Sequence, residues 1–177
     1  MNPDLAKVLY EVCSIRGRFK LRSGQIADEY FDKYLFESRP DLLRSIGEGM
    51  ARLIPAGTDM LAGLELGGVP VAVAIAFRAD LPLLFVRKKA KDYGTAKLAE
   101  GPDFKGRKVL VVEDVVTTGG AIVDGAKALR ERGAVIDTVL CVIDRESGGP
   151  EKLKEYGLTL KPLFTASELR KAAGAVP

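Results

Sequence analysis

Residues 109–122 read VLVVEDVVTTGGAI, and this stretch decides the fold. Its first half is a run of branched apolar residues, a pattern typical of a strand buried on both faces of a parallel sheet. Two acids, Glu113 and Asp114, follow where we expect this strand to end, and two threonines and two glycines fill positions 117–120. Residues 121–132 then have the pattern of a helix. The stretch therefore predicts a strand, a polar turn and a helix, with carboxylates beside the turn.

Each part of this turn suits an anion and a sugar. Glycine lets the backbone approach an anion without a Cβ atom in the way, and the free N–H groups in the first turn of a helix favour negative charge. Threonine hydroxyls add donors, while neighbouring carboxylates can accept hydrogen bonds from sugar hydroxyls or lie near a metal ion. A ribose 5-phosphate would meet all of these groups. The alternative is an ordinary polar turn, which needs neither two acids nor two glycines.

The rest of the chain predicts one α/β domain. Apolar strand patterns alternate with helical patterns through most of its 177 residues, which implies a parallel sheet flanked by helices on both faces. Cations crowd the start of residues 87–101, which fits either a solvated charged face or a mobile loop that closes over a polyanion. Gly67-Gly68 before a helix is a second possible anion site, although a tight connection is equally plausible.

Composition excludes several classes of function. The net charge of +3 is too small to favour nucleic acid as a partner. No apolar run approaches the ~20 residues that cross a bilayer, and the start of the chain does not resemble a signal peptide. We therefore expect a cytoplasmic protein with no membrane partner. The chain has no histidine, so an imidazole base and a metal held by histidine are both excluded.

The central stretch resembles the phosphoribosyl pyrophosphate (PRPP) motif of type I phosphoribosyltransferases. That motif is an apolar run, two acids, two apolar residues and a turn of threonine or serine with glycine. The resemblance implies that PRPP contacts the whole stretch and that Asp114, as a catalytic residue, accepts hydrogen bonds from the ribose hydroxyls. The implied PRPP-binding residues here are Glu113, Asp114, Val115, Val116, Thr117, Thr118, Gly119, Gly120 and Ala121.

Three further strings narrow the resemblance to orotate phosphoribosyltransferases. FKLRSG at 19–24 is similar to a segment of their N-terminal hood, RKKAKDYG at 87–94 to their flexible loop, and DRESGG at 144–149 follows the next strand. The resemblance implies a hood formed by residues 1–38 and an α/β core formed by residues 39–177.

The same strings imply roles for single residues. Orotate would contact Arg22, Thr117 and Arg145, whose planar guanidinium suits a carboxylate. The pyrophosphate of PRPP would contact Arg87, Lys88 and Lys91, and Lys91 is the expected catalytic acid for the leaving group. Neither set includes a protein ligand for a metal.

The implied reaction is transfer of ribose 5-phosphate from PRPP to orotate. Mg²⁺ would bind mainly through PRPP oxygens, as expected for that ion, and relatives act as homodimers with shared active sites. A purine or uracil phosphoribosyltransferase would share the central motif and is the alternative enzyme. A regulatory protein that senses PRPP without turnover is the alternative from another class.

Overall fold

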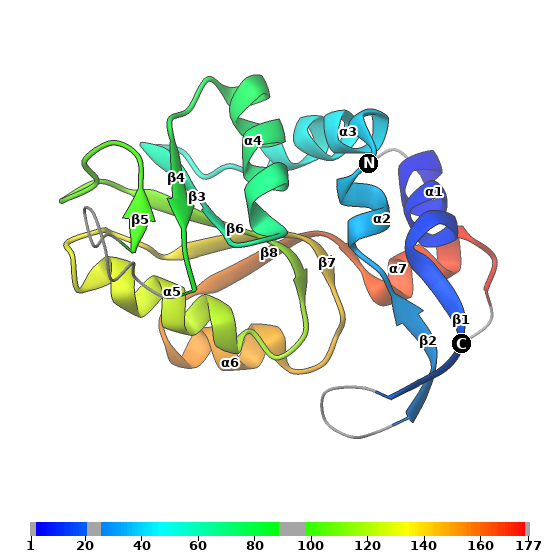
Figure 1. The fold of residues 1–177 in the computed structure, drawn as a ribbon. Coiled ribbons are helices and arrows are strands. Elements are labelled where there is room, and N and C mark those ends of the chain that lie inside the picture. The colour runs from blue at the N-terminus through cyan, green and yellow to red at the C-terminus, as the bar shows by residue number, and fades with distance from the viewer. Residues whose placement is uncertain (1–2, 21–25, 89–97, 176–177) are drawn as a thin grey trace.

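The computed structural model describes residues 3–20, 26–88 and 98–175. Within these residues a six-stranded sheet has the strand order β5-β4-β3-β6-β7-β8 (Figure 1). Neighbouring strands from β4 to β8 run parallel, as predicted, whereas β5 runs antiparallel to β4. The strands are β3 (Met60–Leu64), β4 (Leu83–Val86), β5 (Ala99–Glu100), β6 (Val109–Val116), β7 (Thr138–Asp144) and β8 (Thr159–Thr165).

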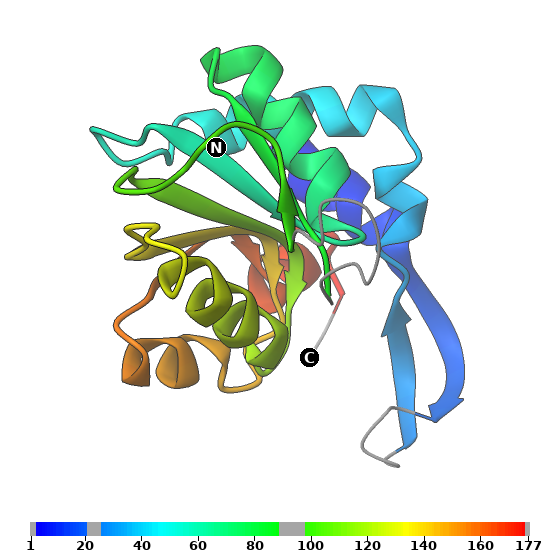
Figure 2. The same cartoon turned by 60° about the vertical axis from the view of Figure 1, so that its left-hand side comes forward.

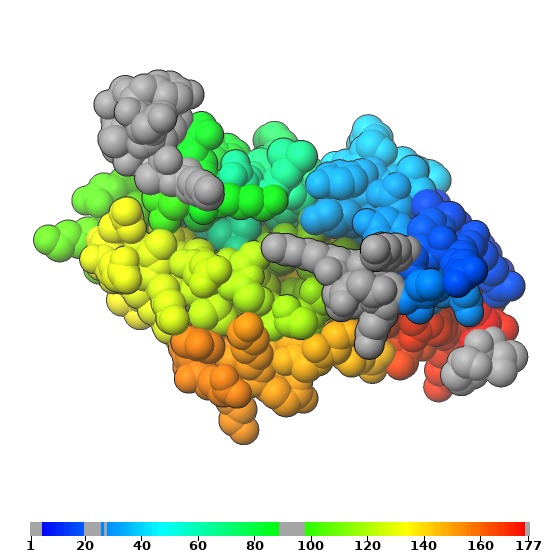
Figure 3. All heavy atoms as spheres, turned by 60° about the horizontal axis from the view of Figure 1, so that its bottom comes forward, coloured from blue at the N-terminus to red at the C-terminus, as the bar shows by residue number. Residues whose placement is uncertain are grey.

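Helices cover both faces of this sheet (Figures 1 and 2). Alternate side chains explain the two layers: Leu61 and Leu110 pack into one cluster, whereas Met60 and Val109 pack into the other. Helices α1, α3, α4 and α7 contribute to the first cluster, and α5 and α6, seen in Figure 3, to the second. The helices are α1 (Pro3–Cys13), α2 (Tyr34–Glu37), α3 (Pro40–Ala51), α4 (Gly68–Ala79), α5 (Gly120–Arg130), α6 (Gly149–Glu155) and α7 (Ala166–Ala172).

The order of the strands marks one place in the sheet. The chain moves outward from β3 to β4, and later outward on the other side from β6 through β7 to β8. The direction therefore reverses between β3 and β6. In open α/β sheets, ligands bind beyond the carboxyl ends of the strands at such a reversal. The turns after β3 and β6 meet there.

The N-terminal segment forms a hairpin that projects from the core (Figure 2). β1 (Ser14–Lys20) pairs antiparallel with β2 (Ile26–Phe31). A single carboxylate ties the hairpin to the body, because Glu29 accepts hydrogen bonds from Tyr10, Ser14 and Arg170, at distances of 2.6 to 3.2 Å. The hairpin is thus joined to α1 and to the C-terminal α7.

Both edges of the sheet have local features that the sequence did not predict. The expected loop at 87–101 contains β5, because Ala99 pairs with Val86 and returns the chain to the sheet. At the other edge, the Thr159 N–H donates to the Asp137 carbonyl at 2.8 Å. Since alternate N–H groups of a strand point to opposite sides, Pro162 in β8 places its nitrogen away from β7.

Candidate active site

The turn after β6 has the form expected of an anion site. Thr117 and Thr118 are exposed, and Gly119 has a φ of +73°, a conformation that favours glycine. Helix α5 begins at Gly120, and its N-cap residue, Gly119, has no side chain to cap the first N–H groups. These donors remain available for a phosphate at the helix N-terminus. The prediction of a strand, turn and helix is confirmed.

The two acids do not lie at the end of the strand, and that expectation was wrong. β6 continues to Val116, because Val115 and Val116 still pair with β7. Glu113 lines a cavity beside α5, whereas Asp114 is 1% exposed and faces the segment that follows the hairpin. There, Asp114 Oδ2 lies 2.5 Å from Lys33 Nζ. Neighbouring residues of a strand point to opposite faces, but the Glu113 side chain turns back, and its Oε1 accepts a hydrogen bond from the Asp114 N–H at 3.0 Å.

Asp114 is surrounded by ionisable groups with shifted pKa values. Burial, reinforced by the nearby Asp114, raises the pKa of Glu37 to about 8 and that of Glu113 to about 9. Burial also opposes ionisation of Asp114, but the nearby side chains of Glu113, Glu37 and Lys33 hold its pKa below the usual value. Burial alone would lower the pKa of Lys33, yet contact with Asp114 raises it. At neutral pH, Asp114 is therefore the charged carboxylate, balanced by the Lys33 ammonium.

A cavity of about 560 Å³ lies beside Glu113. Arg87 and Lys88, the residues predicted to contact the pyrophosphate, line it at the end of β4. The Lys88 N–H donates to Glu65 Oε1 at 2.6 Å, which links the turns after β3 and β4. Lys91 lies outside the described residues. The full lining is Leu64, Glu65, Val86, Arg87, Lys88, Leu98, Glu113, Ala121, Asp124, Gly125 and Ala128.

Arg145 follows β7 and lies next to the turn after β6. Its N–H donates to the Val116 carbonyl at 2.8 Å, which places it beside Thr117. The guanidinium carbon lies 5.0 Å from the centroid of the Phe31 ring, within range of a cation–π contact. Burial, with the nearby Arg170, lowers the pKa of Arg145. No carboxylate forms an ion pair with it in the described ranges, so a half-buried cation is available to an anion. Arg22 lies outside these ranges.

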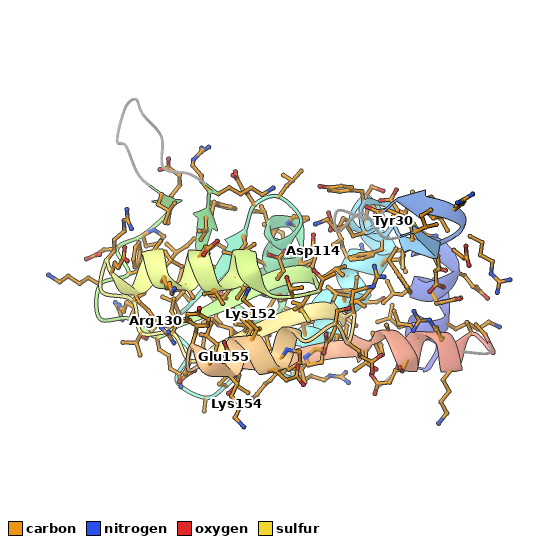
Figure 4. All side chains as sticks on the ribbon, turned by 90° about the horizontal axis from the view of Figure 1, so that it is seen from below. Tyr30, Asp114, Arg130, Lys152, Lys154 and Glu155 are labelled. Carbon is orange, nitrogen blue, oxygen red and sulfur yellow. The ribbon has the colours of Figure 1, made fainter. Side chains whose placement is uncertain are left out.

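Three residues near the turns were missed by the sequence analysis. Lys33 and Glu37 adjoin Asp114, and Lys152 of α6 reaches the turn after β6. The Lys152 Nζ lies 3.8 Å from the point where a Cβ atom on Gly120 would sit. Figure 4 shows Lys152 between α5 and α6, with Lys154 on the far side of α6. The sequence does show a lysine shortly after DRESGG, but the direction of the Lys152 side chain depends on how α6 packs.

Gly67 and Gly68 explain a close approach of two elements. A Cβ atom on Gly67 would lie 1.5 Å from Asp114 Oδ2, and one on Gly68 would lie 2.4 Å from the Val112 carbonyl oxygen. Both glycines therefore let the start of α4 pack directly against β6. This favours the tight connection over a separate anion site.

Among the residues that the structure describes, no helix is both long and apolar enough to cross a membrane. No three acidic, cysteine or histidine side chains among them are grouped so that they could hold a metal ion.

Comparisons with known proteins agree with this geometry. The family model described as "Phosphoribosyl transferase domain" matches residues 38–165. The orotate phosphoribosyltransferase of a Nocardioides species is 52% identical over 175 residues, which cover 99% of this chain and 98% of that protein. That of Methanocaldococcus jannaschii is 43% identical, over 94% of this chain and 95% of that protein.

A solved structure is similar over nearly the whole chain. The Mycobacterium tuberculosis orotate phosphoribosyltransferase in complex with PRPP has a TM-score of 0.80 and 29% identity, covering 94% of this chain and 97% of that one. The match to the domain model spans more than half of the chain, and the curated relatives align along almost its full length. The chain belongs to the phosphoribosyltransferase family and, within it, to the orotate phosphoribosyltransferases.

Proposed function

We propose that this enzyme transfers the 5-phosphoribosyl group from PRPP to orotate, giving orotidine 5′-monophosphate and pyrophosphate in the de novo synthesis of pyrimidines. The observation that carries the choice of base is Arg145, a half-buried cation beside the turn after β6, without a carboxylate partner in the part of the chain described. Orotate brings a carboxylate, whereas uracil, adenine and hypoxanthine do not. An assay with PRPP, Mg²⁺ and each base, following nucleotide and pyrophosphate, tests this. Turnover of any other base in preference to orotate would contradict it.

The geometry supports a role for each part of the site. The turn at 117–121 would bind the 5′-phosphate through its N–H groups and threonine hydroxyls. Asp114 would accept hydrogen bonds from the ribose hydroxyls, and Arg87 would meet the pyrophosphate in the cavity beside Glu113 of its own subunit. Lys88 would meet the pyrophosphate bound to a partner subunit. Lys91 stays the proposed acid for the leaving group. We also propose that the enzyme acts in the cytoplasm.

The chemistry requires electrostatic stabilisation rather than a covalent nucleophile. Departure of pyrophosphate leaves positive charge at the sugar C1, while negative charge gathers on the leaving group. Cations at the end of β4 would neutralise the leaving group, and the charged Asp114 of β6 would stabilise the positive charge that develops on the sugar. Mg²⁺ needs no protein cluster here, since it takes phosphate oxygens and waters readily, and it would supply further neutralisation of the pyrophosphate when bound.

Replacing Lys152 with methionine is expected to weaken PRPP binding about five- to tenfold. Its ammonium lies close enough to Gly120 to attract a phosphate bound at the start of α5, and an exposed charge contact of this kind is worth about 1 kcal/mol. Titration calorimetry with PRPP and Mg²⁺ measures the change. Lys154→Met is the matched control, because that lysine lies in the same helix but faces away from α5 (Figure 4). Equal affinities for both variants would remove Lys152 from the site.

We further propose a homodimer in which Lys88 of one subunit serves the site that contains Asp114 of the other. Lys88→Ala and Asp114→Asn are each expected to be nearly inactive alone. After mixing and subunit exchange, half the dimers are mixed, and in these one site is intact while the other carries both changes. Roughly a quarter of wild-type activity should return, given a closed two-fold dimer. Exchange confirmed by mass spectrometry, without regained activity, would show that each subunit uses its own Lys88.

A further inference from the structure

Two side chains from the segment that follows the hairpin meet at Asp114. Lys33 is 32% exposed, and its Nζ lies 2.5 Å from Asp114 Oδ2. Glu37 is 8% exposed, and its Oε1 has no hydrogen-bond partner among the described residues. Oε1 of Glu37 and Oδ2 of Asp114 both lie within 2.5 Å of the point where a Cβ atom on Gly67 would sit, so these oxygens adjoin each other.

The backbone holds both side chains on one side of the short helix α2. Asp32 Oδ1 accepts a hydrogen bond from the Tyr34 N–H at 3.1 Å, and the Lys33 carbonyl accepts from the Glu37 N–H at 3.1 Å. Phe36 is fully buried and anchors this turn in the core. Residues four apart on a helix lie on the same face. Lys33 and Glu37 are thus directed at Asp114 by a fixed element.

Asp114 has little room for any other partner in this arrangement. Its Oδ1 accepts a hydrogen bond from the Val115 N–H. Its Oδ2 is bounded by Gly67, by Glu37 and by the Lys33 ammonium. Of these three, Lys33 is a partly exposed, flexible side chain, whereas Gly67 and Glu37 are buried. A ligand that donates a hydrogen bond to Oδ2 must therefore displace Lys33.

We propose that Lys33 is a positioning residue for the ribose-binding acid, which it pairs with in the free enzyme and releases to solvent when the ribose hydroxyls of PRPP take its place. The inference rests on the proposed role of Asp114. An ammonium and a hydroxyl both donate hydrogen bonds to a carboxylate, so they compete for the same oxygen atom. The ion pair satisfies the buried carboxylate in the free enzyme until the ribose hydroxyls replace the ammonium.

Competition between Lys33 and PRPP for Asp114 predicts the direction in which the Kd for PRPP changes when Lys33 is removed. A substrate that binds only the released form has its apparent Kd raised by the inverse of the fraction released. Removing Lys33 abolishes the competing contact. The Asp114 carboxylate then lacks a partner in the free enzyme, and the ribose hydroxyls of PRPP would supply one. Loss of Lys33 should therefore tighten PRPP binding. A lysine that only stabilised the fold, or that contacted PRPP itself, would not give this result when removed.

Titration calorimetry of PRPP with Mg²⁺ on the full chain tests the proposal. Lys33→Met is expected to lower the Kd about three- to tenfold, the range for breaking one partly buried ion pair. Its melting temperature should fall without PRPP but match the wild type at saturating PRPP. Lys33→Arg, which keeps the cation, should return the Kd toward the wild-type value. Lys7→Met is the matched control, since Lys7 forms an exposed ion pair with Glu11 far from the site.

A second measurement uses the wild-type enzyme and so does not depend on the folding of a variant. Lysines are acetylated briefly with and without PRPP and Mg²⁺, and modification is quantified by mass spectrometry. Modification of Lys33 is expected to rise about threefold with PRPP, because release from Asp114 lowers the pKa of its amine toward the ordinary value, while Lys7 stays constant.

The outcomes separate this inference from the proposed function. Unchanged or weaker PRPP binding by Lys33→Met, or equal or lower acetylation of Lys33 with PRPP, would overturn the displacement of Lys33 alone. Failure of the wild-type enzyme to bind PRPP would overturn both the displacement and the proposed function.

Discussion

Arg145→Ala is expected to raise the KM for orotate strongly while PRPP binding stays nearly intact. The Arg145 backbone N–H donates to the Val116 carbonyl, which fixes this residue beside the turn after β6. Its guanidinium lies over the Phe31 ring and has no carboxylate partner within the described ranges. Orotate's carboxylate would supply that partner. Removal of one member of a desolvated charge pair costs about 2–4 kcal/mol. Steady-state kinetics with each substrate varied in turn measures the effect.

The matched control for this variant is Arg132→Ala. Arg132 is exposed, and its side chain donates to the Ala128 carbonyl at 2.6 Å at the end of α5, far from both turns. It should leave both KM values unchanged. If Arg145→Ala weakened PRPP binding as much as orotate binding, Arg145 would support the fold of the site rather than recognise the base.

Asp114→Asn is expected to lower kcat/KM for PRPP by about a hundredfold, or ~3 kcal/mol, a loss within the range for removing a buried charged partner. The amide keeps the shape of the carboxyl but turns one acceptor into a donor, which would face the ribose hydroxyls. The fold should survive, because Lys33 is partly exposed and can turn to water when its partner is lost. Calorimetry measures the affinity for PRPP, and circular dichroism checks that the fold survives.

The control for this substitution is Asp41→Asn, which alters an exposed ion pair with Arg39 at the start of α3. That variant should bind PRPP as the wild type does. A PRPP affinity and turnover unchanged by Asp114→Asn would take Asp114 out of the ribose site, and would also remove the basis for displacement of Lys33.

The parts that could be predicted from the sequence are those with local causes. A branched apolar run followed by Thr-Thr-Gly-Gly specifies a buried strand and a tight turn wherever it occurs, and the structure confirms both. The acids were misplaced by two residues because strand ends depend on pairing with β7. The spacing of residues along the sequence does not show how far β6 stays paired with β7.

The missed residues owe their place to contacts between distant segments. Lys33 and Glu37 reach Asp114 because a one-turn helix follows the hairpin and Phe36 fixes it in the core. Lys152 reaches Gly120 because α6 packs against the turn, where a Cβ atom on Gly149 would lie 2.8 Å from the Thr117 carbonyl oxygen. No periodicity or motif encodes such distances. Arg22 and Lys91, the other predicted contacts, lie outside the described residues and stay predictions.

The two edges of the sheet bear on how this enzyme behaves at high concentration. An open edge strand can recruit a strand from another molecule and start β-sheet aggregation. β5 is only two residues long, so it offers few backbone groups to an incoming strand. On the opposite edge, Pro162 removes a donor from the outward side of β8 and costs no bond to β7, because its nitrogen already faces away from that strand. Replacing this proline would restore an outward N–H and create a template for intermolecular strand addition.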